Sequence, residues 1–266
     1  MREIVIPLAT GLAIFLFGMQ VVRIGLEKMA GDRLKQWLYQ FTQTPFISFV
    51  TGLLTTALLQ SSSAVTVLAI GFVNAGVMRF PQCVGLLLGT NLGTCMTTEL
   101  LAIPIEQYAV LMLLTGTICW TSPWRPMRMI GLSIGGLGCI FLGLQAMESI
   151  AESLQRLGLI EVLAAFDTPG WGVLSGLLLT GVIQSSSASV ALVMGLYNAN
   201  AVPLIYALAV VLGSNVGTCI TAWIAAIGGN RAGKQIALTH LLINVAGVLA
   251  FFPLLPMWRD WIERTG

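Results

Sequence analysis

The sequence predicts an all-α integral membrane protein made of two inverted-topology repeats, each with a re-entrant helical hairpin. Composition indicates the membrane: 56% of the 266 residues are hydrophobic, 9% are charged and the mean hydropathy is +0.89, whereas about a quarter of the residues of a soluble domain are charged. Repetition indicates two halves, because Gln-Ser-Ser-Ser-Ala at residues 60–64 recurs at residues 184–188, an offset of 124. Loop charges of opposite sign indicate that one half is inverted.

In the first half, residues 4–22 form an apolar stretch that is long enough for one membrane span. Residues 46–78 are too long for one simple span and too short for two, and the serines at residues 61–63 interrupt them near the middle. A re-entrant hairpin that turns at these serines, with the next helix starting just after them, fits this length. Residues 83–98 and 108–120 provide two further spans.

The second half repeats this order. Its apolar stretches are residues 129–147, 171–200, 204–227 and 236–256. The serine triplet at residues 185–187 interrupts the second of them, so a second hairpin is expected there. We expect residues 1–122 to form the first repeat and residues 123–266 the second. Together they form one transmembrane domain with about six spans and two hairpins.

Loop charges indicate how the halves face the membrane. The segment after the first span is rich in basic residues: Arg23, Lys28, Arg33 and Lys35. Its counterpart in the second half is acidic: Glu148, Glu152, Glu161 and Asp167. Because Lys and Arg accumulate in cytoplasmic loops, equivalent loops of opposite charge lie on opposite sides. We therefore expect an inverted second half, with both termini outside. The other basic turns then lie inside: Arg79, Arg125, Arg128, Arg231 and Lys234.

Each serine triplet is a candidate anion-binding element. A helix that starts just after a triplet directs free backbone N–H groups and its positive dipole end at the hairpin tip, and the hydroxyls add further donors. Two such tips that approach from opposite sides form a small chamber suited to a tetrahedral oxyanion. The candidate anion-binding residues are Ser61, Ser62, Ser63, Ser185, Ser186 and Ser187.

A second repeated motif supplies candidate cation ligands. Residues 89–94 read Gly-Thr-Asn-Leu-Gly-Thr, and residues 213–218 read Gly-Ser-Asn-Val-Gly-Thr. Their glycines allow a helix either to unwind or to pack closely, and their neutral oxygens suit sodium. The candidate sodium ligands are Gln60, Asn91, Thr94, Gln184, Asn215 and Thr218. Because Lys and Arg are almost absent between the motifs of each half, co-bound cations must balance the charge of a bound anion.

These duplicated motifs resemble the type II sodium-dependent phosphate cotransporter family of bacteria and animals, over nearly the whole chain. The resemblance implies that the two Gln-Ser-Ser-Ser elements form a phosphate and sodium site. His240 and Asn244 resemble a His-x-x-x-Asn element of the family and are accessory candidates. Residues 113–117 lack this element, so the Asp of electrogenic animal members has no counterpart. We expect the chain to resemble a bacterial member of the family without a PhoU-like domain.

The resemblance implies sodium-coupled transport of inorganic phosphate by alternating access, in the cell (inner) membrane as a multi-pass protein. Its partners are phosphate, sodium and the lipid bilayer, with sodium as the coupling ion and no other cofactor or nucleic acid. An enzyme is not expected, because the single histidine, His240, lies on a different span from either serine triplet. Three alternatives stay open: a carrier of sulfate or carboxylates, a phosphate exporter, and a membrane scaffold subunit that transports nothing.

Three polar residues also have a purely structural interpretation. Gln20 and Gln145 lie at matching positions in the two halves. We interpret both as interhelical hydrogen-bonding residues rather than substrate ligands. A structural hydrogen-bonding role is the alternative for His240 as well.

Overall fold

The computed structural model describes residues 2–30, 40–103, 105–149 and 168–265. These residues form helices and contain no strand, so the all-α prediction is confirmed for them. The α-helices are α1 (Arg2–Ala30), α3 (Pro45–Leu59), α4 (Ser62–Asn74), α5 (Phe80–Ala102), α6 (Ala109–Trp120), α7 (Arg125–Glu148), α10 (Pro169–Ile183), α11 (Ser186–Asn198), α12 (Leu204–Ala226), α13 (Arg231–Phe251) and α14 (Leu255–Thr265). Two short 3₁₀ helices are η1 (Glu106–Tyr108) and η2 (Phe252–Leu254). The loop residues Arg33, Lys35, Glu152, Glu161 and Asp167 lie outside the described residues.

The sequence repeat corresponds to a repeated unit of three helices. Helices α3 and α10 have 15 residues each, α4 and α11 have 13, and α5 and α12 have 23. In both halves the third helix packs closely along the first, α5 along α3 and α12 along α10. The offset of 124 residues therefore relates helices of equal length and similar packing as well as motifs.

In the described part of the chain, four helical segments are long and apolar enough to cross a membrane: Val5–Met29, Arg125–Glu148, Leu204–Ala226 and Arg231–Arg264. Helix α5 matches α12 in length, but Gln82, Asn91 and Glu99 make it less apolar. Helix α6 has 12 residues, fewer than the roughly 20 of a full span. These helices support a membrane protein. The expected number of six membrane spans stays a prediction.

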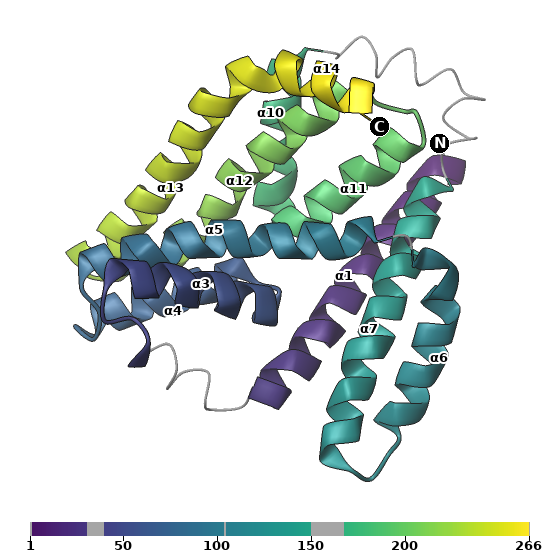
Figure 1. Cartoon of the computed structure of the whole chain (residues 1–266), viewed down its shortest axis with the longest axis horizontal. Helices are drawn as coiled ribbons and strands as arrows, with labels where there is room; N and C mark the ends of the chain where they lie inside the picture. Colours follow the sequence, from purple (N-terminus) through teal and green to yellow (C-terminus); the bar gives the residue numbers. More distant parts are fainter. Residues whose placement is uncertain (1, 31–39, 104, 150–167, 266) are drawn as a thin grey trace.

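The helices form two bodies that meet through an apolar interface. Helix α7 packs along both α1 and α6, and Figure 1 shows these three helices side by side, apart from the larger body that contains α3, α5 and α10–α13. The backbones of α1 and α7 approach closely, because a Cβ atom on Gly18 would lie 2.7 Å from the carbonyl oxygen of Gly136. Phe15, Phe141 and Ala188 belong to one buried apolar cluster that joins the two bodies through α11.

Candidate functional site

Both serine motifs lie at a break between two helices. Helix α3 ends at Leu59 and α4 begins at Ser62, with Gln60 between them at φ 53° and ψ 32°. Gln184 takes the same left-handed conformation at φ 57° and ψ 27°. A residue other than glycine is strained there by about 1–3 kcal/mol, which is typical of functional sites.

The position of the break corrects one expectation from the sequence. We expected the turn at the triplet and the helix just after it, but the turn lies at Gln60 and the helix starts within the triplet. The cause is capping, since the Ser61 hydroxyl oxygen accepts a hydrogen bond from the Ala64 N–H at 3.3 Å. Ser185 caps α11 in the same way, at 3.3 Å from the Ala188 N–H. The second and third serines of each triplet therefore form the first turn of a helix.

The two tips enclose a small chamber. It has a volume of about 40 Å³, whereas one water needs about 10–15 Å³. The described residues that line it are all polar and uncharged: Thr56, Gln60, Ser61, Ser62, Ser63, Thr94, Gln184, Ser185, Ser186 and Ser187. The structure thus brings together all six serines and both glutamines that the sequence identified. The first N–H groups of α4 and α11 add donors at the helix ends.

The second motif lies within continuous helices. Residues 89–94 belong to α5 and residues 213–218 to α12, so of the two expected roles of these glycines the structure shows close packing. A Cβ atom on Gly89 would collide with the carbonyl oxygen of Phe49, and one on Gly213 with that of Val173. The motif therefore holds α5 against α3 and α12 against α10.

This packing decides which candidate sodium ligands reach the chamber. Thr94, Gln60 and Gln184 line it, whereas Asn91, Asn215 and Thr218 do not. Asn91 is two residues from Gly89 and from Gly93, so it lies on the opposite side of α5 from the face that packs against α3. Its side-chain amide donates to Asn244 Oδ1 at 2.8 Å. Thr218 is buried and donates to the Ser214 carbonyl oxygen at 3.0 Å, and the side chain of Asn215 is exposed.

Asn244, one of the two accessory candidates, forms a buried polar link between the halves. His240 and Asn244 are 2% and 5% exposed, and neither lines the chamber. The Asn244 amide donates to the His240 carbonyl oxygen and to the Cys219 sulfur, both at 3.1 Å. With the bond from Asn91, this connects α5 of the first half with α12 and α13 of the second. His240 takes part only through its backbone, because its ring nitrogen Nδ1 is buried without a hydrogen-bond partner among the described residues. A structural hydrogen-bonding role of its side chain therefore stays a prediction.

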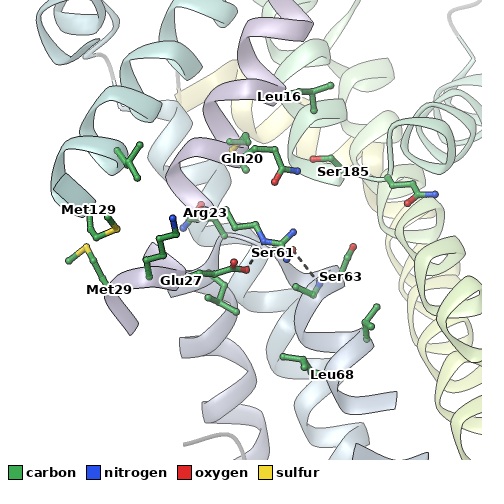
Figure 2. Close-up of a pocket in the computed structure, with 18 of the residues that line it drawn as sticks. Leu16, Gln20, Arg23, Glu27, Met29, Ser61, Ser63, Leu68, Met129 and Ser185 are labelled. Atoms are coloured by element: carbon green, nitrogen blue, oxygen red, sulfur yellow. Dashed lines mark hydrogen bonds and ion pairs between the residues drawn. The ribbon is translucent and has the colours of Figure 1, made fainter. Parts of the chain in front are cut away.

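A much larger open cavity adjoins the chamber, and we call it the vestibule. Its volume is about 1570 Å³, and Gln60, Ser61, Ser63, Gln184 and Ser185 line both cavities. Figure 2 shows Gln20, Arg23, Ser61, Ser63 and Ser185 around it. Among the described residues, four basic side chains and one carboxylate line the vestibule: Arg23, Lys28, Arg125, Arg128 and Glu27.

The charged lining was not expected from the sequence. The first two basic residues are on α1 and the other two on α7, about a hundred positions apart, and only the packing of these helices joins them. Arg23 forms an ion pair with Glu27 at 2.7 Å. The matched glutamines also differ, since Gln20 lines the vestibule while the Gln145 amide donates to the Glu106 carbonyl oxygen at 2.8 Å. Of these two glutamines, the expected hydrogen bond between helices is therefore present for Gln145 and not for Gln20.

A helical membrane protein with a polar chamber at two broken helices has the architecture of a secondary transporter. A family model described as "Na+/Pi-cotransporter" matches residues 14–149 and 152–263. The chain belongs to the Na+/Pi-cotransporter family. The resemblance inferred from the two motifs is thereby confirmed, and the family is one of transporters.

Curated relatives have names that fit this family. "Uncharacterized protein YqeW" of Bacillus subtilis (strain 168) is 38% identical over 94% of this chain and 82% of the relative. "Putative inorganic phosphate export protein YjbB" of Escherichia coli (strain K12) is 26% identical over 97% of this chain, which spans 48% of that protein. Human "Sodium-dependent phosphate transport protein 2C" is 33% identical over 46% of this chain and 22% of its own length. No solved structure gives a significant match.

Proposed function

We propose that this protein transports inorganic phosphate across the cell membrane by alternating access, coupled to sodium. The observation that carries the proposal is the chamber of about 40 Å³ between the two serine tips. Its hydroxyls and helix-end N–H groups are hydrogen-bond donors, which a tetrahedral oxyanion accepts from several directions. Its small volume favours a compact inorganic ion over a carboxylate such as succinate.

Sodium completes the charge balance of this chamber. None of the described residues that line it carries a charge, and an anion in a site away from water needs an opposite charge nearby. Thr94 donates its own proton to the Thr90 carbonyl oxygen at 2.9 Å, so its oxygen keeps lone pairs for a cation. The Gln60 amide nitrogen donates to the Ala57 carbonyl oxygen at 2.6 Å, which leaves Oε1 as an acceptor. Both groups suit a hard cation.

The proposed topology has six spans and two re-entrant hairpins, with residues 1–122 and 123–266 as inverted repeats of one transport domain. Helices α3 and α4 have 15 and 13 residues. At 1.5 Å per residue each is about 20 Å long, shorter than the roughly 30 Å hydrocarbon core. A pair that enters and leaves on one side therefore explains the short helices and the strained break.

The position of the vestibule indicates the side of the membrane to which this conformation is open. Its basic side chains come from the end of α1 and the start of α7, which the positive-inside rule assigns to the cytoplasm. At the other end of α7, the Asn198 amide donates to Glu148 Oε1 at 2.9 Å and ties α11 to α7. We infer a state that is open to the cytoplasm, between the α1–α6–α7 bundle and the larger body. A shift of one body against the other would expose the chamber to the outside.

Phosphate export is the second candidate, and the same vestibule favours it. A basic entrance on the cytoplasmic side concentrates anions where an exporter receives them. The relative YjbB of Escherichia coli is named as a putative inorganic phosphate export protein. The driving gradients set the direction of a coupled carrier, so both candidates share one binding site.

Uptake of radiolabelled phosphate into proteoliposomes tests the proposal. An inward sodium gradient is expected to drive accumulation, and an equal potassium gradient is not. Excess unlabelled phosphate should block the uptake, while sulfate and succinate should compete weakly. Equal uptake in both gradients would refute the coupling, and stronger competition by sulfate or succinate would refute the substrate.

Neutralising the charges of the vestibule is expected to change the KM for phosphate, in opposite directions for the basic residues and for the carboxylate. The paired change Lys28→Gln and Arg125→Gln is expected to raise the KM for phosphate about 3-fold at low ionic strength, and Glu27→Gln to lower it. The matched control is Arg231→Gln with Lys234→Gln, two basic residues at the start of α13 that do not line the vestibule. The assay uses vesicles with the cytoplasmic face outward. Changes of KM that persist in 1 M salt would contradict an electrostatic cause.

A further inference from the structure

Thr56 lines the chamber and has a buried hydroxyl without a partner. The residue lies on α3, one turn before Gln60, and is 1% exposed. Among the described residues, Thr56 Oγ1 is the buried unpartnered polar atom that belongs to the chamber lining. Thr94 and Thr218 donate to their own helix, whereas Thr66 and Thr221 also lack a partner but do not line the chamber. Buried polar groups are normally hydrogen-bonded, so the unpartnered hydroxyl of a chamber-lining residue indicates a missing partner.

The matching residue of the second half shows what Thr56 lacks. Thr180 lies 124 positions later, is 0% exposed, and donates to Ser189 Oγ at 2.7 Å. Ser189 in turn donates to the Ser185 carbonyl oxygen at 3.2 Å. In the first half, the position of Ser189 is occupied by Val65, which offers no acceptor. The two halves therefore hold the same threonine, once with a partner in the protein and once without.

Packing fixes where the Thr56 hydroxyl can point. A Cβ atom on Gly93 would lie 2.8 Å from Thr56 Cβ, and one on Gly217 would lie 2.8 Å from Thr180 Cβ. Each threonine thus fits against a glycine of the second motif. Because a β-branched side chain has few allowed rotamers in a helix, this contact restricts the direction of its hydroxyl. The second motif therefore positions Thr56 at the edge of the chamber.

We propose that Thr56 donates a hydrogen bond to the oxyanion bound between the serine tips, an inference that rests on the proposed function. The Thr56 hydroxyl has no acceptor for its proton in the protein, and an oxygen of the bound oxyanion can accept this hydrogen bond. A sodium ion would use the oxygen lone pair and leave the proton unpaired. Helix α3 thus contributes a donor that its counterpart α10 does not, so the site is asymmetric although the repeat is symmetric.

Equilibrium binding of radiolabelled phosphate to the purified chain in sodium chloride tests this donor. Thr56→Val keeps the side-chain shape and is expected to raise the Kd for phosphate about tenfold, without lowering the thermal unfolding temperature of the ligand-free protein. Thr56→Ser keeps a hydroxyl and should retain most of the affinity. The matched control Thr180→Val removes a hydroxyl that is already paired, so it should lower the unfolding temperature and leave the Kd unchanged.

A third variant leaves every side chain that lines the chamber in place and adds a hydrogen-bond partner for Thr56. Val65→Ser offers Thr56 the partner that Ser189 gives to Thr180, and it is expected to raise the Kd as well. An unchanged Kd in Thr56→Val would overturn the inference, as would a change in sodium dependence alone, which would assign the hydroxyl to the cation. Wild-type protein that binds no phosphate would instead refute the proposed function.

Discussion

Replacing Ser62 and Ser186 with alanine in one chain is expected to weaken phosphate binding at least 100-fold and to abolish transport. These serines are the first residues of α4 and α11, and both line the chamber. A hydrogen bond to a charged group contributes about 1.5–3 kcal/mol, so two lost donors correspond to roughly 3–6 kcal/mol. A factor of ten corresponds to about 1.4 kcal/mol. Isotope binding and proteoliposome uptake measure the two effects.

The helix caps should survive this double change. Ser61 and Ser185 provide the capping hydroxyls, so the unfolding temperature is expected to stay close to that of the wild type. Ser48→Ala serves as the control, because Ser48 is a fully buried serine of α3 that does not line the chamber. Equal losses of affinity in the control and in the double variant would exclude a specific role of the tips.

The second large effect concerns the glycines that hold the helices together. Gly213→Ala is expected to lower the unfolding temperature by about 5–10 °C, because the new Cβ would collide with the carbonyl oxygen of Val173 and force α10 away from α12. Gly89→Ala should have a similar effect through Phe49. Thermal unfolding of the detergent-solubilised protein measures both.

A glycine-to-alanine substitution at a position without close neighbours is expected to raise the stability instead of lowering it. Gly247 lies on α13, and a Cβ atom there meets nothing within 4 Å. Since alanine has a higher helix propensity than glycine by up to about 1 kcal/mol, Gly247→Ala is expected to raise stability slightly. A stable Gly213→Ala variant would show that the backbones at this contact can separate without loss, contrary to the packing described above.

The parts of the fold that could be predicted from the sequence were predicted from its internal repeat. Two copies of a motif in register identified matching helices, and the serines together with Gln60 and Gln184 do line one chamber. The helix start was misplaced, because the sequence shows three equivalent serines and only the backbone reveals that Ser61 and Ser185 act as caps. Capping is a local choice among neighbours that a motif alone does not resolve.

The remaining parts of the site depend on packing between distant segments. The glycine contact of α5 turns Asn91 away from the chamber and brings Thr56 to it. Thr56 had one signal in the sequence, a threonine that recurs as Thr180 while the partner position changes from Ser189 to Val65. The vestibule likewise exists only once α1 packs against α7. Periodicity and composition carry no information on such contacts.

Equilibrium binding of radiolabelled phosphate, in sodium chloride and in choline chloride of equal ionic strength, tests the central claim most directly. The claim is that one chamber between the two serine tips holds phosphate together with sodium. It predicts one phosphate per chain in sodium, a Kd at least tenfold weaker in choline, and a loss of affinity in Ser62→Ala and in Ser186→Ala alike. The same Kd in both salts, or a loss in only one of the two variants, would contradict it.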